Sequence, residues 1–259
     1  SPGASGSLAA NNALIIDTTA PSAPSSLTTT STTTSDTTPT ITGTAEAGST
    51  VEVFSGSTSL GTTTADGNGT FSFTPSSALN DATHSITATT ADAAGNTSSA
   101  SSALSITVDT TASTISGVSS STANGSYKVG DSITINVAFS EAVTVDTTNG
   151  TPTLELETGS TNRTASYSSG SGSSTLAFTY TVQSGDTASD LDYSSTSALS
   201  LNSGTIKDAA GNNATLSLAS PGASASLAGS SALVVDGVVP TISGVSSSTA
   251  NGSYKVGDS

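Results

Sequence analysis

Apolar and polar residues alternate along several short stretches of the chain with a period of two. The clearest stretch is LAFTYTV at residues 176–182. This alternation is typical of half-buried β-strands, and no long segment shows helical periodicity. Asn-Gly pairs, for example at residues 68–69 and 124–125, favour turns between the stretches. The pattern therefore predicts an all-β chain of short strands.

The expected strands fall into two groups, and the first has seven, the number found in immunoglobulin-like sandwiches. In the first group they are expected near residues 24–30, 38–44, 50–55, 58–65, 70–74, 83–90 and 101–108. In the second group they are expected near residues 114–119, 132–139, 152–158, 163–168, 175–183, 198–206 and 214–218, with a last extended piece at 231–235. This organisation predicts tandem immunoglobulin-like β-sandwich domains in an extended array.

An internal repeat sets the domain boundaries. The string TISGVSSSTANGSYKVGDS occurs at residues 114–132 and again at 241–259, and residues 1–17 are echoed by residues 220–236. Such self-similarity at a fixed period indicates tandem repeats. We therefore expect the following order: the tail of a preceding repeat (1–17), two complete sandwiches (18–109 and 110–236) and the start of the next repeat (237–259).

The composition excludes several classes of function. Nineteen acidic residues against four basic ones give a net charge of −15. A nucleic-acid-binding protein needs a basic surface, and docking on anionic lipid needs one too. The sequence contains no apolar run long enough to cross a bilayer and no cysteine, so neither membrane insertion nor disulfides are expected. The charge fits a surface protein or one that binds cations.

Acidic residues recur at equivalent places in the two predicted domains. The motif DAAGN precedes the last strand of each domain, at residues 92–96 and 208–212. An aspartate ends each final strand, and a glutamate follows the second strand of each domain. These residues are Asp17, Asp109 and Asp236, and Glu46 and Glu141.

Sandwich topology brings the loop after the second strand and the loop before the last strand to the pole where the chain enters the domain. Two acidic sets are therefore expected: Asp17, Glu46 and Asp92, with Asp66 nearby, and Asp109, Glu141 and Asp208. Converging carboxylates favour a cation, and Ca²⁺, which takes six to eight oxygen ligands, is the natural candidate. Asn96 and Asn212 are candidates to complete the two shells. The alternative is that Asp and Asn form ordinary turns.

A second acidic cluster is expected at the opposite pole of the second domain. It contains Asp186, Asp190 and Asp192, with Asp131 close by. The cluster is either another cation site or a solvated loop.

Catalysis is not expected. His84 is the only histidine and is expected on the surface of a strand, and the chain has no tryptophan to form a sugar platform beside paired carboxylates. A carbohydrate-binding module would expose aromatic residues, and only Tyr127, Tyr193 and Tyr254 are expected to be free for that role.

Several motifs carry a resemblance to a known family. In the first domain they are DTTAPSAP, TPTITGTAEAGSTVEVF, ADGNGTFSFTP and TADAAGNTSSAS; in the second they are YKVGDSITINVAFSEAVTV, FTYTVQSGDTASDLDY and GTIKDAAGN. With these motifs the chain resembles the bacterial immunoglobulin-like repeats of giant, type I-secreted, biofilm-associated surface adhesins.

The resemblance implies an extracellular stalk or spacer on the bacterial cell surface, with structural Ca²⁺ between successive modules. It implies that the partners are neighbouring repeats of the same chain, and a host surface or matrix reached through other domains. Two alternatives remain open, which are a module of an extracellular filament or matrix fibre and a carbohydrate-binding or ligand-binding adhesive domain. The linker departs from the family pattern at Ser113, where the proline of DTTAP is lost, and this leaves the backbone freer there.

Overall fold

The computed structural model describes residues 16–257, whose regular secondary structure is almost entirely β-strand, so the prediction of an all-β chain is confirmed. Residues 1–15 of the expected preceding repeat lie outside the described part. The described chain forms two compact units. Within the described residues, the first comprises residues 16–114, Glu141–Val145 and Ile206–Thr215, and the second comprises Ile115–Ser140, Asp146–Thr205 and residues 216–257.

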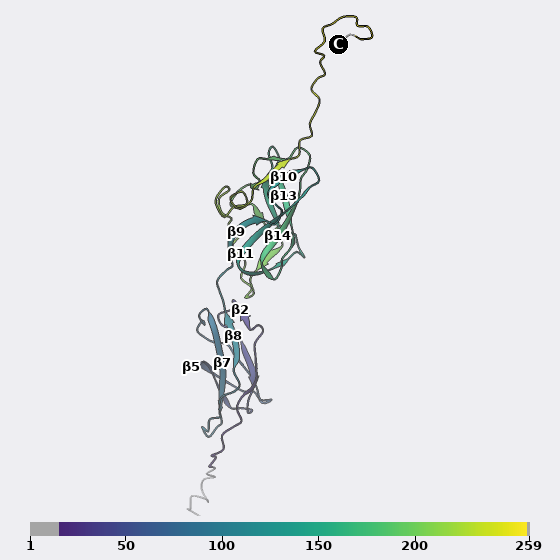
Figure 1. Ribbon diagram of the computed structural model, residues 1–259. Coiled ribbons are helices and arrows are strands. Elements are labelled where there is room, and N and C mark those ends of the chain that lie inside the picture. The colour runs from purple at the N-terminus through teal and green to yellow at the C-terminus, as the bar shows by residue number, and fades with distance from the viewer. Residues whose placement is uncertain (1–15, 258–259) are drawn as a thin grey trace, which may run out of the picture. The chain divides into compact units, whose positions relative to one another are not determined.

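Two sheets make up most of the first unit. One has the strand order β1-β3-β6 and the other has the order β2-β8-β7-β4-β5. The strands are β1 (Ser25–Thr28), β2 (Thr33–Thr34), β3 (Ile41–Thr44), β4 (Thr50–Ser55), β5 (Thr58–Thr64), β6 (Thr70–Phe73), β7 (Ala82–Ala91) and β8 (Leu104–Val108). β2 pairs with β8 in parallel, and β7, β8 and β2 are seen together in Figure 1. Seven of these strands overlap the predicted ones, and only the two-residue β2 was not predicted.

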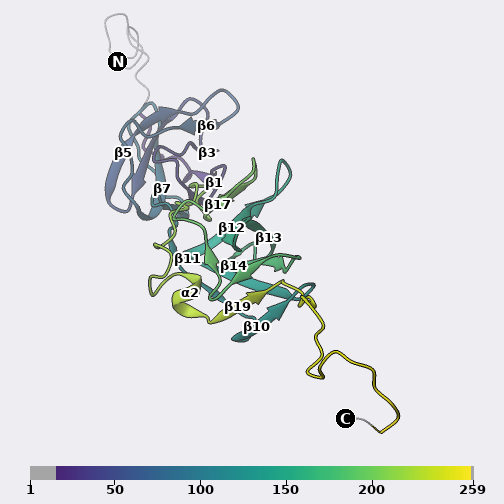
Figure 2. The same cartoon turned by 90° about the horizontal axis from the view of Figure 1, so that it is seen from above.

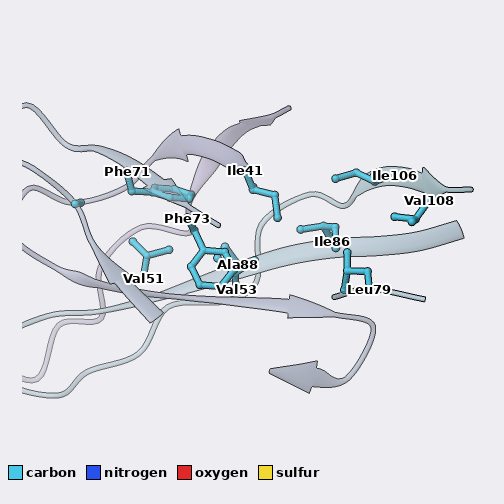
Figure 3. Close-up of a cluster of buried hydrophobic side chains, with 11 residues drawn as sticks. Ile41, Val51, Val53, Phe71, Phe73, Leu79, Ile86, Ala88, Ile106 and Val108 are labelled. Atoms are coloured by element: carbon cyan, nitrogen blue, oxygen red, sulfur yellow. The ribbon is translucent and has the colours of Figure 1, made fainter. Parts of the chain in front are cut away.

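Alternate residues of these strands fill the space between the two sheets (Figure 3). In β6, Phe71 and Phe73 are buried while Thr70 and Ser72 face the solvent. The buried cluster consists of Ile41, Val51, Val53, Ala65, Phe71, Phe73, Leu79, Ile86, Ala88, Ile106 and Val108. Burying each large apolar side chain contributes about 1.5–3 kcal/mol, so mostly aliphatic residues suffice to hold the sheets together.

An eight-stranded sheet and a three-stranded sheet form the rest of the fold. The larger sheet has the order β16-β12-β13-β14-β11-β18, with β9 also paired to β11 and β17 to β12. Its strands are β9 (Ile115–Ser120), β11 (Ser132–Asp146), β12 (Thr153–Glu157), β13 (Arg163–Ser169), β14 (Ser173–Thr181), β16 (Asp192–Tyr193), β17 (Leu199–Ser200) and β18 (Thr205–Lys207). The smaller sheet has the order β10-β19-β15.

The smaller sheet consists of β10 (Gly125–Lys128), β15 (Thr187–Ala188) and β19 (Leu233–Asp236), and the pair β10 and β19 is visible in Figure 2. A single helical turn, α2 (Leu227–Ser230), is capped by the Ser226 hydroxyl and buries Leu227. The sequence predicted neither α2 nor β10, because one helical turn is too short to show a period and β10 has no buried residue to alternate with its exposed ones. The strand predicted near 214–218 is replaced by an isolated bridge between Thr114 and Thr215.

The long strand β11 determines where one acidic side chain lies. It was predicted to end at Phe139, yet it continues to Asp146, and Phe139 and Val143 are both buried. Because the chain does not turn after Phe139, Glu141 belongs to a strand and not to a loop.

Candidate metal centre

The three aspartates predicted to end a final strand form the same local turn. In each, Oδ1 accepts a hydrogen bond from the backbone N–H two residues later. The pairs are Asp17 with Thr19 at 2.9 Å, Asp109 with Thr111 at 2.9 Å, and Asp236 with Val238 at 3.1 Å. This turn holds one carboxylate oxygen in place and so orients the carboxylate.

The two DAAGN loops share one hydrogen-bonding scheme. Asp208 Oδ1 accepts from the N–H groups of Ala210 and Asn212, both at 2.9 Å, and its Oδ2 accepts from Asn212 Nδ2 at 2.9 Å. The same Nδ2 donates to the carbonyl oxygen of Asp109 at 2.9 Å. The loop at residues 92–96 repeats all of these bonds, including the one from its asparagine to the carbonyl oxygen of Asp17. Each loop is therefore tied to a linker aspartate.

Only one of the two predicted acidic sets is brought together. Asp109, Glu141 and Asp208 each offer a carboxylate oxygen, and these oxygens all lie within 4.8 Å of one another. We call these three residues the acidic group. They come from the segment after β8, from β11 and from the loop after β18, so three separate parts of the chain meet at this point.

The set around the first DAAGN loop is not gathered in this way among residues 16–257. Glu46 is exposed and lies in a tight turn, where its carbonyl oxygen accepts from the N–H of Ser49 at 3.1 Å. Asp66 is occupied in the turn before β6, where it accepts from Asn68 and Thr70. The difference between the sets therefore comes from the glutamate, which lies in a turn in one case and in a strand in the other.

The acidic group carries uncompensated negative charge. Asp208 is only 4% exposed, while Asp109 and Glu141 are half-buried. Burial, followed by the charges of Asp208 and Asp109, raises the pKa of the Glu141 carboxyl. Calcium–oxygen distances are about 2.3–2.6 Å, so two oxygens on one ion can be at most about 5 Å apart. The spacing of the acidic group fits this limit, and its all-oxygen donors suit Ca²⁺.

The acidic cluster near Asp186 is not a group of this kind, because among the described residues only Asp109, Glu141 and Asp208 bring three carboxylates to metal-ligand spacing. Asp186 pairs with the guanidinium of Arg163 at 2.8 Å and accepts from the hydroxyl of Tyr180 at 2.6 Å. The remaining bonds join Asp131 to Lys128, Asp190 to the N–H of Leu233, and Asp192 to Gly222 and Ser226. These aspartates stabilise the fold locally.

Two residues expected at the surface are buried, so those predictions were wrong. His84 is 9% exposed, with Nδ1 at 2.9 Å from the Ser55 hydroxyl and Nε2 at 3.0 Å from the carbonyl oxygen of Asn80. A carbonyl only accepts, so Nε2 carries the proton. Tyr193 is fully buried and donates to the carbonyl oxygen of Ala219 at 2.7 Å. Both polar groups can be buried because each has a partner.

Asp81 is a residue that sequence reasoning missed. It precedes β7, and its carboxylate accepts hydrogen bonds from Thr110 and Thr111 in the linker after β8. The register that pairs Ala82 with Val108 brings these residues together. The sequence offers no local signal for this contact, because 29 positions separate Asp81 from Thr110.

Comparison with known proteins agrees with this architecture. Two different family models match the chain, and each is described as a bacterial Ig-like domain. One covers residues 12–110 and the other covers residues 109–227. No curated protein matches the chain significantly. The described residues contain no helix with the length and apolar character needed to cross a membrane. The chain therefore contains two bacterial Ig-like domains in tandem.

Proposed function

We propose that this chain is a structural spacer of a bacterial surface adhesin, and that Ca²⁺ bound by Asp109, Glu141 and Asp208 stiffens the linker after β8. The observation that carries the proposal is the convergence of these three carboxylates from three separate segments. Bacterial Ig-like domains are non-enzymatic structural modules and are typical of extracellular or surface proteins, which supports the spacer role.

The donor set favours calcium over other common ions. Zinc prefers cysteine and histidine, and the chain has no cysteine and a single histidine, which is bound to Ser55 and Asn80. Magnesium demands stricter octahedral geometry and keeps more of its water. Calcium accepts carboxylates in irregular arrangements and completes its shell with water, which suits three carboxylates at a half-buried position.

Each residue of the acidic group would contribute a different restraint. Asp109 belongs to the linker itself. Its carbonyl oxygen accepts from Asn212 Nδ2, and its Oδ1 accepts from the N–H of Thr111. Asp208 is the most buried of the three and is preorganised by its loop. Glu141 would connect the cation to strand β11. Joining them through one cation would tie the linker to β11 and to the loop after β18. At a free calcium concentration 100 times Kd, this would stabilise the bound state by about 2.7 kcal/mol.

The surface chemistry fits an extracellular spacer. A net charge of −15 keeps such a protein soluble and discourages association with anionic surfaces. The expected partners are neighbouring repeats of the same chain, with a host surface or matrix contacted by other domains.

Calcium binding can be tested by isothermal titration and by thermal unfolding in millimolar Ca²⁺, in EDTA and in Mg²⁺. We expect the wild-type chain to gain stability in Ca²⁺ only, and Asp208→Asn to lose this gain. Asp92→Asn is the matched control, because it makes the same change in a loop with the same hydrogen bonds outside the acidic group. Identical wild-type unfolding in Ca²⁺ and in EDTA would contradict the proposal. The first set, Asp17, Glu46 and Asp92, stays a prediction, and a calcium response lost in Asp92→Asn would support it.

A further inference from the structure

The linker after β8 is held on one side by the exposed carboxylate of Asp81. Thr110 donates to it through the backbone N–H at 3.1 Å and through Oγ1 at 2.8 Å, and Thr111 donates through Oγ1 at 3.2 Å. The hydroxyl of Thr110 is the main reason that the pKa of the Asp81 carboxyl is lowered. One carboxylate therefore binds two consecutive linker residues.

The linker is also held at Asp109. Its N–H donates to the carbonyl oxygen of Thr34 at 3.0 Å, and its carbonyl oxygen accepts from Asn212 Nδ2 at 2.9 Å. Its Oδ1 accepts from the N–H of Thr111 at 2.9 Å. The orientation of the Asp109 carboxylate therefore depends on where the backbone of Thr111 lies.

These bonds form a chain from Asp81 to the acidic group. Asp81 fixes Thr110 and Thr111, and the Thr111 N–H fixes Asp109 Oδ1. The same turn orients the Asp109 carboxylate, one oxygen of which lies within 4.8 Å of a carboxylate oxygen of Glu141 and of Asp208. Asp81 does not itself belong to the acidic group.

We propose that Asp81 is a positioning residue for the calcium site, which holds the linker so that Asp109 meets Glu141 and Asp208 before the ion arrives. This inference rests on the proposed calcium binding and adds a residue outside the site that determines its affinity. Without Asp81, the linker residues lose the only side chain described as binding both of them. The conformer ready to bind calcium then becomes a minor one, and the apparent Kd rises in inverse proportion to its population.

The test uses the whole chain and compares calcium Kd by isothermal titration for wild type, Asp81→Ala, Asp81→Asn and Asp146→Ala. Asp81→Ala is expected to weaken calcium binding by about tenfold with unchanged stoichiometry, if the binding conformer falls to about one tenth. Asp81→Asn keeps an oxygen that can accept from Thr110 and should stay closer to wild type. Asp146→Ala is the matched control, because Asp146 also accepts from a threonine N–H and hydroxyl, but only within its own turn.

A second measurement works without calcium. Hydrogen exchange of the Thr110 amide in EDTA should be faster in Asp81→Ala than in wild type, because this N–H donates to Asp81. Thermal unfolding in EDTA should change little, since Asp81 is exposed.

Each outcome separates two explanations. Equal losses in Asp81→Ala and Asp81→Asn would mean that Asp81 acts through its negative charge, and would overturn the positioning role. Wild-type affinity in Asp81→Ala would overturn it too, while leaving the calcium site intact. If the wild-type chain binds no calcium, the proposed function fails first, and the inference fails with it.

Discussion

Glu141→Gln gives the sharpest test of the acidic group, because it removes one charge while keeping the size of the side chain. In the wild-type chain, Glu141 has its pKa raised by burial and by the charges of Asp208 and Asp109. Ionisation of Glu141 is therefore less favourable in the folded chain than in the unfolded chain unless a cation is bound. The amide should stabilise the fold without calcium and weaken the calcium response.

The magnitude follows from the spacing of the oxygens. Two unit charges 4.8 Å apart repel by about 1 kcal/mol in water and by about 3.5 kcal/mol at an effective dielectric constant of 20. Because Glu141 is half-buried and solvent screens its charge, we expect a gain of about 1–2 kcal/mol in EDTA at pH 7. For a domain the size of residues 110–236, 1 kcal/mol shifts the unfolding midpoint by about 4 °C.

The assay is thermal unfolding of both proteins in EDTA and in millimolar Ca²⁺. Glu141→Gln should unfold at the higher temperature in EDTA, and wild type should unfold at the higher temperature in Ca²⁺, so the order inverts. Glu46→Gln is the matched control, because Glu46 is exposed and outside the acidic group. It should leave both midpoints unchanged.

The pH dependence in EDTA has a defined sign. The folded-state pKa of Glu141 is raised above 4.5, so the folded state binds this proton more tightly than the unfolded state. Protonated Glu141 therefore adds to the free energy of unfolding. This addition is fully present below pH 4.5 and is lost as the pH rises through the folded-state pKa. The Gln variant lacks this term, so its stability relative to wild type should grow across that window. A Glu141→Gln chain that is less stable than wild type in EDTA at pH 7, yet responds fully to calcium, would refute the reasoning.

Two further predictions concern the fold. Asp186→Ala should lower the free energy of unfolding in urea by about 3–5 kcal/mol, because it leaves Arg163 without its buried partner. Burial raises the pKa of Asp186, but its hydrogen bonds lower that pKa more. The stability that ionised Asp186 contributes should therefore be lost as the pH falls through the lowered pKa. Gly150→Ala should destabilise the fold by about 1–3 kcal/mol, because the added Cβ would lie 1.6 Å from the carbonyl oxygen of Asn202. Gly67→Ala is the control, since its Cβ would meet nothing within 4 Å and the change should be neutral. A urea midpoint for Gly150→Ala as high as that for Gly67→Ala would contradict the close approach.

Strand positions could be predicted from the sequence because burial leaves a period of two on every strand that packs against the core. β6 shows it plainly, with Phe71 and Phe73 inside and Ser72 outside. Strands β15 and β16 could not be predicted, because each has two residues, which are too few to show any period. His84 lies at an inward-facing position of β7, but a polar residue there is expected to be exposed unless hydrogen-bond partners for it are known.

The acidic site was only partly predictable. The repeated DAAGN motif indicated two loops with the same role, and both loops do make the same hydrogen bonds. What the motif could not reveal is that Glu46 ends in a turn while Glu141 continues a strand. That choice depends on how β11 pairs with its neighbours, which is a long-range property.

The sequence by itself determined that this protein is a tandem array of β-sandwiches with acidic residues at equivalent loops, because side-chain alternation and repetition are local properties of the chain. Only the tertiary structure decided which carboxylates meet. Asp109, Glu141 and Asp208 are 32 or more positions apart, and strand pairing brings them within 4.8 Å of one another. The hydrogen bonds between Asp81 and the linker have the same origin, since they form only because the register of β7 and β8 places Asp81 beside Thr110.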